Sequence, residues 1–211
     1  MTGIDKNETN LVLLNCVFIT ALLVSNVCAS KIIAIGPFEF SAAVISYPWT
    51  FLMTDVIGEI WGRLYARRTV QIGIACQLLS LLLIYIAIAL PPASYMIDYA
   101  DEYREVLGST ARVVLASLIA FIFAQSCDVF LFHKLRSKEH ARFKWLRNNT
   151  STMISQAVDT VIFITIAFWG VVPDMLFMIG SQYLIKVLMA LLDTPFFYLL
   201  TRGSEHQNPV E

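Results

Sequence analysis

Hydrophobic residues in this chain come in long blocks, and the polar residues are concentrated between those blocks. A hydrophobic helix of roughly 20 residues crosses the hydrocarbon core of a bilayer, whereas an alternating or one-sided pattern is typical of soluble strands and helices. The blocks predict an all-α, polytopic membrane protein whose six transmembrane helices form one bundle and a single domain over residues 1–211. The predicted spans lie near residues 11–30, 42–61, 69–90, 111–133, 152–172 and 175–201.

Prolines mark two boundaries between the predicted spans. Pro91 and Pro92 end the third span because proline cannot continue the helical hydrogen-bond ladder, and Pro173 separates the fifth from the sixth. The connector over residues 91–108 interleaves tyrosines with acids, which leaves two interpretations open: a short amphipathic helix in the membrane interface, or a solvated connector. The first span is expected to be retained rather than cleaved as a signal peptide, because it is long and five more spans follow it.

Basic residues are distributed unevenly between the two sides of this predicted topology. Eleven Lys and Arg residues lie in the termini and in the second and fourth loops. Three others, Lys31, Arg104 and Arg112, fall on the opposite side. Because short cytoplasmic loops carry the excess of positive charge in membrane proteins, both termini are predicted to be cytoplasmic.

Composition and charge narrow the class of function. Hydrophobic residues make up 57% of the chain and charged residues 15%, against about 45–50% and about 25% in soluble domains. A net charge of −1 creates no positive field that attracts a polyanion, so a nucleic-acid partner is excluded. The zinc-protease, serine-hydrolase and P-loop motifs are missing from the sequence, as are clusters of Cys and His. No enzyme activity, catalytic residue, metal site or cofactor is therefore expected.

Apart from Arg112 at the edge of the fourth span, six charged residues stand inside the predicted spans, where each costs about 2.5–3.5 kcal/mol to insert and usually has a function. They are Asp55, Glu59, Asp128, Asp159, Lys186 and Asp193. Asp55 and Glu59 are one helical turn apart and therefore share a face. Lys186 neutralises only one of the five acids, so the others need protons, water or a hydrogen-donating ligand. The polar positions predict a carboxylate-rich central cavity for a small solute.

Several polar and aromatic residues also have a structural interpretation. Asn26, like Asn15 and Gln77, is equally well explained by hydrogen bonds between helices. Asp193 lies just before a proline and would cap a new helical segment if that proline breaks the sixth span. Aromatic residues near the span ends, Tyr47 among them, fit the interfacial belts of membrane proteins, although an aromatic platform in the cavity also suits a flat heterocycle. The third span lacks charged residues and is expected to pack or to face lipid.

The six charged residues named above, together with Asn26, lie in stretches that resemble the queuosine precursor transporter family, also called the vitamin uptake transporter family. The most specific stretch, residues 47–62, reads YPWTFLMTDVIGEIWG. The other matching stretches contain Ser25-Asn26, Asp128-Val129-Phe130, Ser155-Gln156 with Asp159-Thr160, Lys186, and Asp193-Thr194-Pro195. The resemblance implies a multi-pass protein of the cell inner membrane that imports 7-cyano-7-deazaguanine, 7-aminomethyl-7-deazaguanine or queuine. The resemblance alone supplies the substrate, whereas the residues themselves indicate an acidic cavity for a nitrogen-rich base.

The candidate substrate-binding residues are Asn26, Asp55, Glu59, Gln156, Asp159 and Lys186. The carboxylates would accept hydrogen bonds from the N–H groups of a deazaguanine, and the two amides would donate to its carbonyl oxygen. Lys186 would balance one acid and break that pair during transport. Proton coupling or charge balance is assigned to Asp128 and Asp193.

Three functions remain as alternatives at this stage. The first is a carrier that works alone, with or without proton coupling. The second is the substrate-binding subunit of an energy-coupling-factor transporter for a vitamin or nucleobase, since such subunits have this size and six helices. The third is a membrane scaffold that binds no small molecule. The expected partners are a deazapurine and the lipid bilayer, and a homodimer is left open because six helices enclose only a small cavity.

Overall fold

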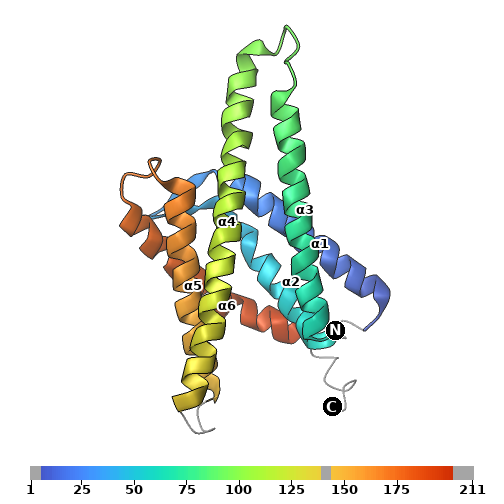
Figure 1. Cartoon of the computed structure of the whole chain (residues 1–211), viewed down its shortest axis with the longest axis vertical. Helices are drawn as coiled ribbons and strands as arrows, with labels where there is room; N and C mark the ends of the chain where they lie inside the picture. Colours follow the sequence, from blue (N-terminus) through green and yellow to red (C-terminus); the bar gives the residue numbers. More distant parts are fainter. Residues whose placement is uncertain (1–5, 139–143, 202–211) are drawn as a thin grey trace. The chain divides into compact units, whose positions relative to one another are not determined.

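The computed structural model describes residues 6–138 and 144–201, which are almost entirely helical (Figure 1). Six α-helices follow the order of the predicted spans, and a hairpin with a 3-10 turn lies between the first two helices. The elements are α1 (Glu8–Cys28), β1 (Ile32–Ile35), β2 (Phe38–Ser41), η1 (Ala42–Ile45), α2 (Tyr47–Ile60), α3 (Arg63–Ala89), α4 (Ile97–Lys138), α5 (Lys144–Phe168) and α6 (Met175–Thr201).

The chain divides into two compact units. The first unit comprises Met1–Ile33, Ser41–Thr110 and Ile185–Glu211, and the second comprises Ala34–Phe40 and Ala111–Leu184. The first unit therefore holds α1 to α3 together with the C-terminal part of α6. The second holds most of α4, all of α5 and the N-terminal part of α6.

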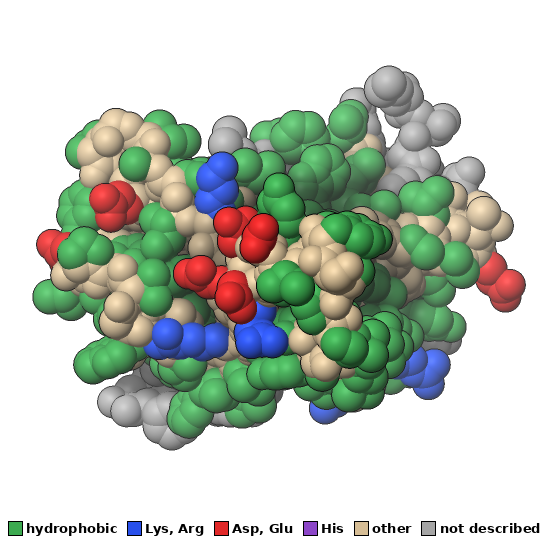
Figure 2. Space-filling view, turned by 90° about the horizontal axis from the view of Figure 1, so that it is seen from above, with side chains coloured by type: hydrophobic (Ala, Val, Ile, Leu, Met, Phe, Trp, Pro, Cys, Tyr) green, Lys and Arg blue, Asp and Glu red, His purple; other side chains and the backbone are tan. Residues whose placement is uncertain are grey.

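Three helices in the described part of the chain are long and apolar enough to cross a bilayer: Glu8–Cys28, Leu64–Ala89 and Ile97–Ala124. Two shorter apolar helical stretches, Met153–Phe168 and Met175–Met189, follow them. Figure 2 shows a face that hydrophobic side chains largely cover, with charged side chains gathered in small groups. These features are those of a helical membrane protein, whereas six crossings and cytoplasmic termini stay predictions.

The segment predicted as the second span is only partly α-helical. Residues 42–45 form η1, and α2 begins at Tyr47 and has 14 residues. Before them, β1 and β2 pair around Gly36 and Pro37, where a φ of +60° at Gly36 supplies the positive φ of a tight hairpin turn. The all-α prediction missed this hairpin, because strands of four residues are too short to register in a search for apolar blocks.

Helix α4 begins earlier than the apolar pattern predicted. It starts at Ile97, so residues 97–108 are helical and the connector from α3 shortens to residues 90–96, whereas the location of this helical stretch in the membrane interface or in solvent stays a prediction. No proline interrupts this stretch, and the single Gly108 costs a helix only about 1 kcal/mol. Asp98 lies in the first turn, where the helix dipole favours a negative charge.

The last two helices differ in how well the sequence predicted them. Helix α5 begins at Lys144 rather than near residue 152, whereas α6 has the predicted bounds of 175 and 201. Pro195 lies inside α6 and does not end it. No new helix starts there, so the interpretation of Asp193 as the cap of a separate segment is wrong.

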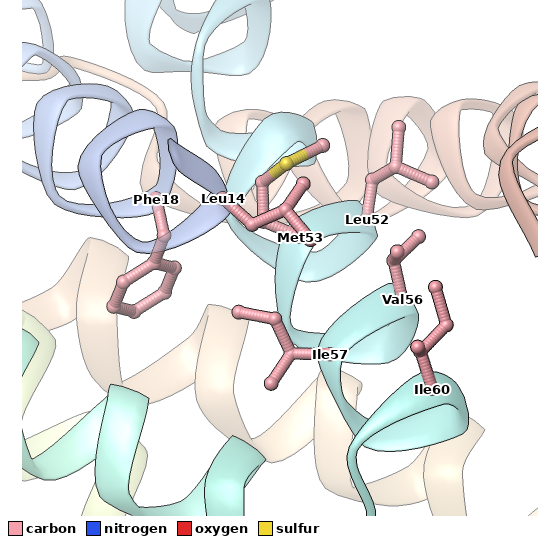
Figure 3. Packing of buried hydrophobic residues seen from close by; sticks show 7 residues of the cluster. All are labelled: Leu14, Phe18, Leu52, Met53, Val56, Ile57 and Ile60. Atoms are coloured by element: carbon pink, nitrogen blue, oxygen red, sulfur yellow. The ribbon is translucent and has the colours of Figure 1, made fainter. Parts of the chain in front are cut away.

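Seven buried hydrophobic residues hold α1 against α2 in the first unit (Figure 3). They are Leu14 and Phe18 of α1 and Leu52, Met53, Val56, Ile57 and Ile60 of α2. Ala66 of α3 and Phe197 and Leu200 of α6 pack against this cluster. Because lipid is as apolar as these side chains, close packing stabilises such a cluster in a membrane more than the hydrophobic effect does.

Helix α3 contacts α1 along a seam that has one polar and one steric contact. Thr69 Oγ1 donates a hydrogen bond to Asn15 Oδ1 at 2.8 Å, as the structural interpretation of Asn15 predicted. One turn further along α3, a Cβ atom at Gly73 would lie 2.5 Å from the Phe18 ring and 3.1 Å from the Leu22 side chain. Gly73 therefore lets the two helices approach closely. We call these five residues the α1–α3 seam.

In the second unit, Arg112 of α4 caps the end of α5. Its Nε donates to the Ile166 carbonyl and its Nη2 to the Trp169 carbonyl, both at 2.7 Å. Carbonyls at a helix C-terminus lack partners within the helix, so the guanidinium satisfies them. Nearer the start of α5, the Met153 carbonyl accepts a hydrogen bond from Tyr183 Oη of α6 at 3.3 Å.

Candidate functional site

The acidic residues of α2 lie beside the face that packs into the core. Tyr47, Phe51, Asp55 and Glu59 follow one another at intervals of four residues. This spacing places successive members on one side of the helix, and we call the four residues the α2 stripe. Phe51, Asp55 and Glu59 are exposed and Tyr47 is half-buried, whereas the core residues of α2 are buried. The helix thus gives Asp55 and Glu59 the shared face that their spacing predicted.

The aromatic end of the α2 stripe lies next to Lys186 of α6. The Tyr47 and Phe51 rings meet edge to face, with centroids 5.1 Å apart and an interplanar angle of 87°. The Lys186 Nζ atom lies over the Tyr47 ring, 5.9 Å from its centroid, which is near the outer limit of a cation–π contact. Lys186 is half-buried and belongs to the same unit as α2. The α2 stripe therefore runs from an aromatic end beside a cation to an acidic end.

Asn26 and Gln77 are buried amides of the first unit with different hydrogen bonding. Asn26 Nδ2 donates to the Leu22 carbonyl at 3.0 Å, so one of its two amide hydrogens is committed to α1 itself. Gln77 of α3 is 3% exposed, and among the described residues its Nε2 has no hydrogen-bond partner. A buried donor left unpaired costs roughly 1–3 kcal/mol. Within the part of the chain that the structure describes, the Nε2 group therefore makes no hydrogen bond between helices of the kind that was one interpretation of Gln77, and Gln77 stays among the polar groups of interest.

Helix α5 holds the predicted site residues of the second unit. Gln156 and Asp159 are half-buried, three residues apart and on one side of the helix. Ser155 and Thr160 beside them are buried, and Thr160 Oγ1 donates to the Gln156 carbonyl at 2.8 Å. Gln182 of α6 is 4% exposed and was not among the candidates. A lone amide in an apolar block was the signal that would have selected it.

The predicted site residues fall into two groups. The first unit holds Asn26, Asp55, Glu59 and Lys186, and the second holds Gln156 and Asp159. The convergence of these groups on one cavity stays a prediction. The side chains of Asp128 and Asp193 lie outside the described residues. In the part of the chain that the structure describes, no three His, Cys, Asp or Glu residues gather in a way that could hold a metal ion.

Comparison with known proteins places the chain in a family. Residues 41–200 match the family model described as "Putative vitamin uptake transporter". The chain belongs to this family. It is 36% identical over 157 residues to the "Probable queuosine precursor transporter" of Bacillus subtilis (strain 168), a match that covers 73% of this chain and 68% of the relative. It is 31% identical over 147 residues to the "Queuosine precursor transporter" of Escherichia coli (strain K12), with coverage of 69% and 62%.

Membership in the vitamin uptake transporter family confirms the resemblance seen in the sequence and makes the chain a transporter rather than an enzyme. The match covers the α2 stripe, the α5 residues and Lys186, whereas Asn26 lies before its first residue. The chain spans less than two thirds of the length of the Escherichia coli relative. No solved structure matches the chain.

Proposed function

We propose that the chain imports a deazaguanine precursor of queuosine across the cell inner membrane, as a single six-helix domain with both termini in the cytoplasm. The observation that carries the proposal is the family match over residues 41–200, together with relatives whose names give queuosine precursors as their cargo. The cargo is 7-cyano-7-deazaguanine, 7-aminomethyl-7-deazaguanine or queuine.

The polar residues of α5 and α2 suit the rim of a guanine-like ring. Such a ring presents two N–H donors beside one carbonyl acceptor. A carboxylate accepts from both donors and an amide donates to the carbonyl, which is the pair of groups that Asp159 and Gln156 offer on one side of α5. In this proposal, Asp55 or Glu59 and Asn26 complete the contacts from the first unit.

The excess of acids in the predicted spans supports compensation of their negative charge by protons or by the cargo. Apart from Arg112 at the edge of the fourth span, five acids and one base stand in the predicted spans, so protons or cargo must compensate most of the negative charge. In the proposed cycle, Lys186 balances Asp159 or Asp193, and Asp128 carries a proton. In this proposal, the proton carried by Asp128 couples import to the proton gradient.

Transport by the purified chain alone tests the proposal. The protein is reconstituted in liposomes, and uptake of labelled 7-cyano-7-deazaguanine is measured without ATP, with and without a proton gradient, against protein-free liposomes. Uptake that rises with the gradient is the expected result.

Two other outcomes would replace the proposal. Binding without uptake would favour the substrate-binding subunit of an energy-coupling-factor transporter. A bound ligand raises the melting temperature by mass action. The absence of both uptake and such a shift with any of the three precursors would therefore leave a scaffold role.

A further inference from the structure

We propose that Tyr47 is the aromatic platform on which the flat ring system of the cargo stacks, and that Lys186 covers this platform when no cargo is bound. This inference rests on the proposed import of a planar heterocycle. It adds a residue that recognises the ring face, whereas carboxylates and amides recognise the rim. Tyr47 and Phe51 are the aromatic members of the α2 stripe, and their acidic neighbours continue along the same helix.

One contact of the Tyr47 ring and one contact of the residue before it position Tyr47. The Phe51 ring, one turn later, meets it edge to face at 5.1 Å between centroids. On the other side, Tyr47 follows Ser46, whose hydroxyl lies 2.8 Å from that of Ser25 and is hydrogen bonded to it. Ser25 is a buried residue of α1, so α1 anchors the point where α2 begins. A ring held in this way is a preorganised surface, and its use costs little conformational entropy.

Lys186 and a planar ligand use the same feature of Tyr47. The Lys186 Nζ atom lies over the ring at 5.9 Å from its centroid. A cation is attracted to the face of an aromatic ring, and a heterocyclic base stacks on that face. Arrival of the cargo therefore moves the ammonium off the ring.

Tyr47 also stands where the backbone changes from a 3-10 turn to an α-helix. Helix α2 has 14 residues and is therefore roughly 21 Å long, which is shorter than the hydrocarbon core of roughly 30 Å. Non-helical backbone at membrane depth is tolerated only where protein or a water-filled cavity surrounds it. Transporters with interrupted helices bind their cargo next to the interruption. If α2 crosses the membrane, the half-buried Tyr47 side chain lies at the break in that crossing, where only Ser46 separates it from the end of η1.

Equilibrium binding of 7-cyano-7-deazaguanine to the full chain in lipid nanodiscs tests the platform. Tyr47→Leu removes the ring, and the affinity is expected to fall roughly 5- to 150-fold, the range of a lost base–aromatic stack. Tyr47→Phe and Tyr47→Trp keep a ring face and should stay within about threefold of the wild type. Tyr85→Leu changes an exposed tyrosine of α3 and serves as the matched control, with unchanged affinity.

The outcomes separate the platform from the proposed function. Wild-type affinity in Tyr47→Leu would overturn the platform and leave import intact, whereas failure of the wild type to bind any of the three precursors would overturn both. If the melting temperature shows that Tyr47→Leu does not fold, Tyr47→Met fills the space without a ring face and must lose affinity equally. The effect of Lys186→Gln on the affinity is measured in the wild type and in the Tyr47→Leu variant. Equal fold-changes on the two backgrounds would overturn the role given to Lys186.

Discussion

Thr69 of α3 donates its hydroxyl hydrogen to the side-chain oxygen of Asn15 of α1, 2.8 Å away. Hydrogen bonds between membrane helices contribute about 0.6 kcal/mol on average. We expect Thr69→Val to lower the free energy of unfolding by about 0.5–1.5 kcal/mol, because it also leaves the Asn15 oxygen without this donor. Unfolding in mixed micelles, measured for Thr69→Val, Asn15→Leu and the double variant, should give a coupling energy of this size.

A hydroxyl that bonds only to its own helix provides the control for this pair. Ser109 Oγ donates to the Val106 carbonyl one turn earlier in α4. Ser109→Ala should change the free energy of unfolding by less than about 0.5 kcal/mol. Strict additivity of the Thr69 and Asn15 substitutions would contradict a direct contribution of their hydrogen bond.

Gly73 should tolerate no side chain. A Cβ atom at this position would lie 2.5 Å from the buried Phe18 ring, so α1 and α3 must separate or the ring must leave its rotamer. We expect Gly73→Ala to destabilise the protein by about 1–3 kcal/mol, the usual cost of overpacking. Adding Phe18→Leu should restore part of this loss, which thermal unfolding of the two variants measures.

Gly108 of α4 is the matched glycine for this comparison, because a Cβ atom there would meet nothing within 4 Å. Gly108→Ala should leave stability unchanged or raise it by up to about 1 kcal/mol, since alanine favours the helix. A Gly73→Ala protein as stable as Gly108→Ala would show that the α1–α3 seam is not tightly packed.

Arg112 should be replaceable by neither lysine nor glutamine. Its guanidinium donates to the carbonyls of Ile166 and Trp169 at once, and a single ammonium cannot reproduce this fork. Either substitution is expected to lower the free energy of unfolding by about 1 kcal/mol, which lowers the melting temperature by about 2–4 °C. Arg104→Gln, which changes an exposed arginine earlier in α4, should leave the melting temperature where it is. Equal effects of the Arg112 and Arg104 substitutions would argue against the cap.

Asp159→Asn should abolish or greatly reduce import. Asparagine keeps the shape of the side chain but presents N–H donors toward the N–H donors of a guanine-like ring. At least one hydrogen bond that the Asp159 carboxylate would accept is therefore lost. We expect uptake of 7-cyano-7-deazaguanine to fall by a factor of about 10 or more. Uptake at the wild-type rate and affinity would remove Asp159 from the site.

Asp174→Asn is the matched control for this substitution. Asp174 Oδ1 accepts a hydrogen bond from the Phe177 amide at 3.0 Å and caps the start of α6. Asparagine caps a helix as well as aspartate does, so import should be unchanged. A loss of uptake in Asp174→Asn as large as in Asp159→Asn would show a general effect of removing a charge.

Membrane topology is tested by reporter fusions along the chain. With six crossings and cytoplasmic termini, alkaline phosphatase should be active when joined after Ala93 or after Pro173, on the outer side. Green fluorescent protein should fluoresce when joined after Gly62 or at the C-terminus. An active phosphatase at the C-terminus would contradict a cytoplasmic C-terminus.

The order of the helices was predictable because each apolar block is long and polar residues or prolines separate the blocks. The bounds of α6 were predicted because apolar residues fill that helix to both ends. The start of α4 was not, since helicity continues through the acidic residues 97–106, whereas the apolar pattern ends there. Hydropathy reports the surroundings that a segment needs, not the length of its helix.

The candidate site was predictable only within single helices. Spacing alone places Asp55 and Glu59 on one face of α2, because it depends on local helix geometry. The contact of Lys186 with Tyr47 joins two segments far apart in the sequence, and no spacing rule encodes it. Tyr47 was assigned chiefly to an interfacial belt for the same reason. The unpaired amide of Gln77 likewise emerges only from the packing around it.

The α1–α3 seam also constrains how this protein can move. A phenylalanine ring seated on a glycine and a hydrogen bond one turn away tie α1 to α3 at two points. If α3 slid along α1 by one turn, Thr69 or Gln77 would replace Gly73 opposite the Phe18 ring. Either side chain is larger than glycine, so such a shift is unfavourable. We expect these helices, together with α2, to move as one unit. If import proceeds by alternating access, its hinges are to be sought outside this N-terminal trio.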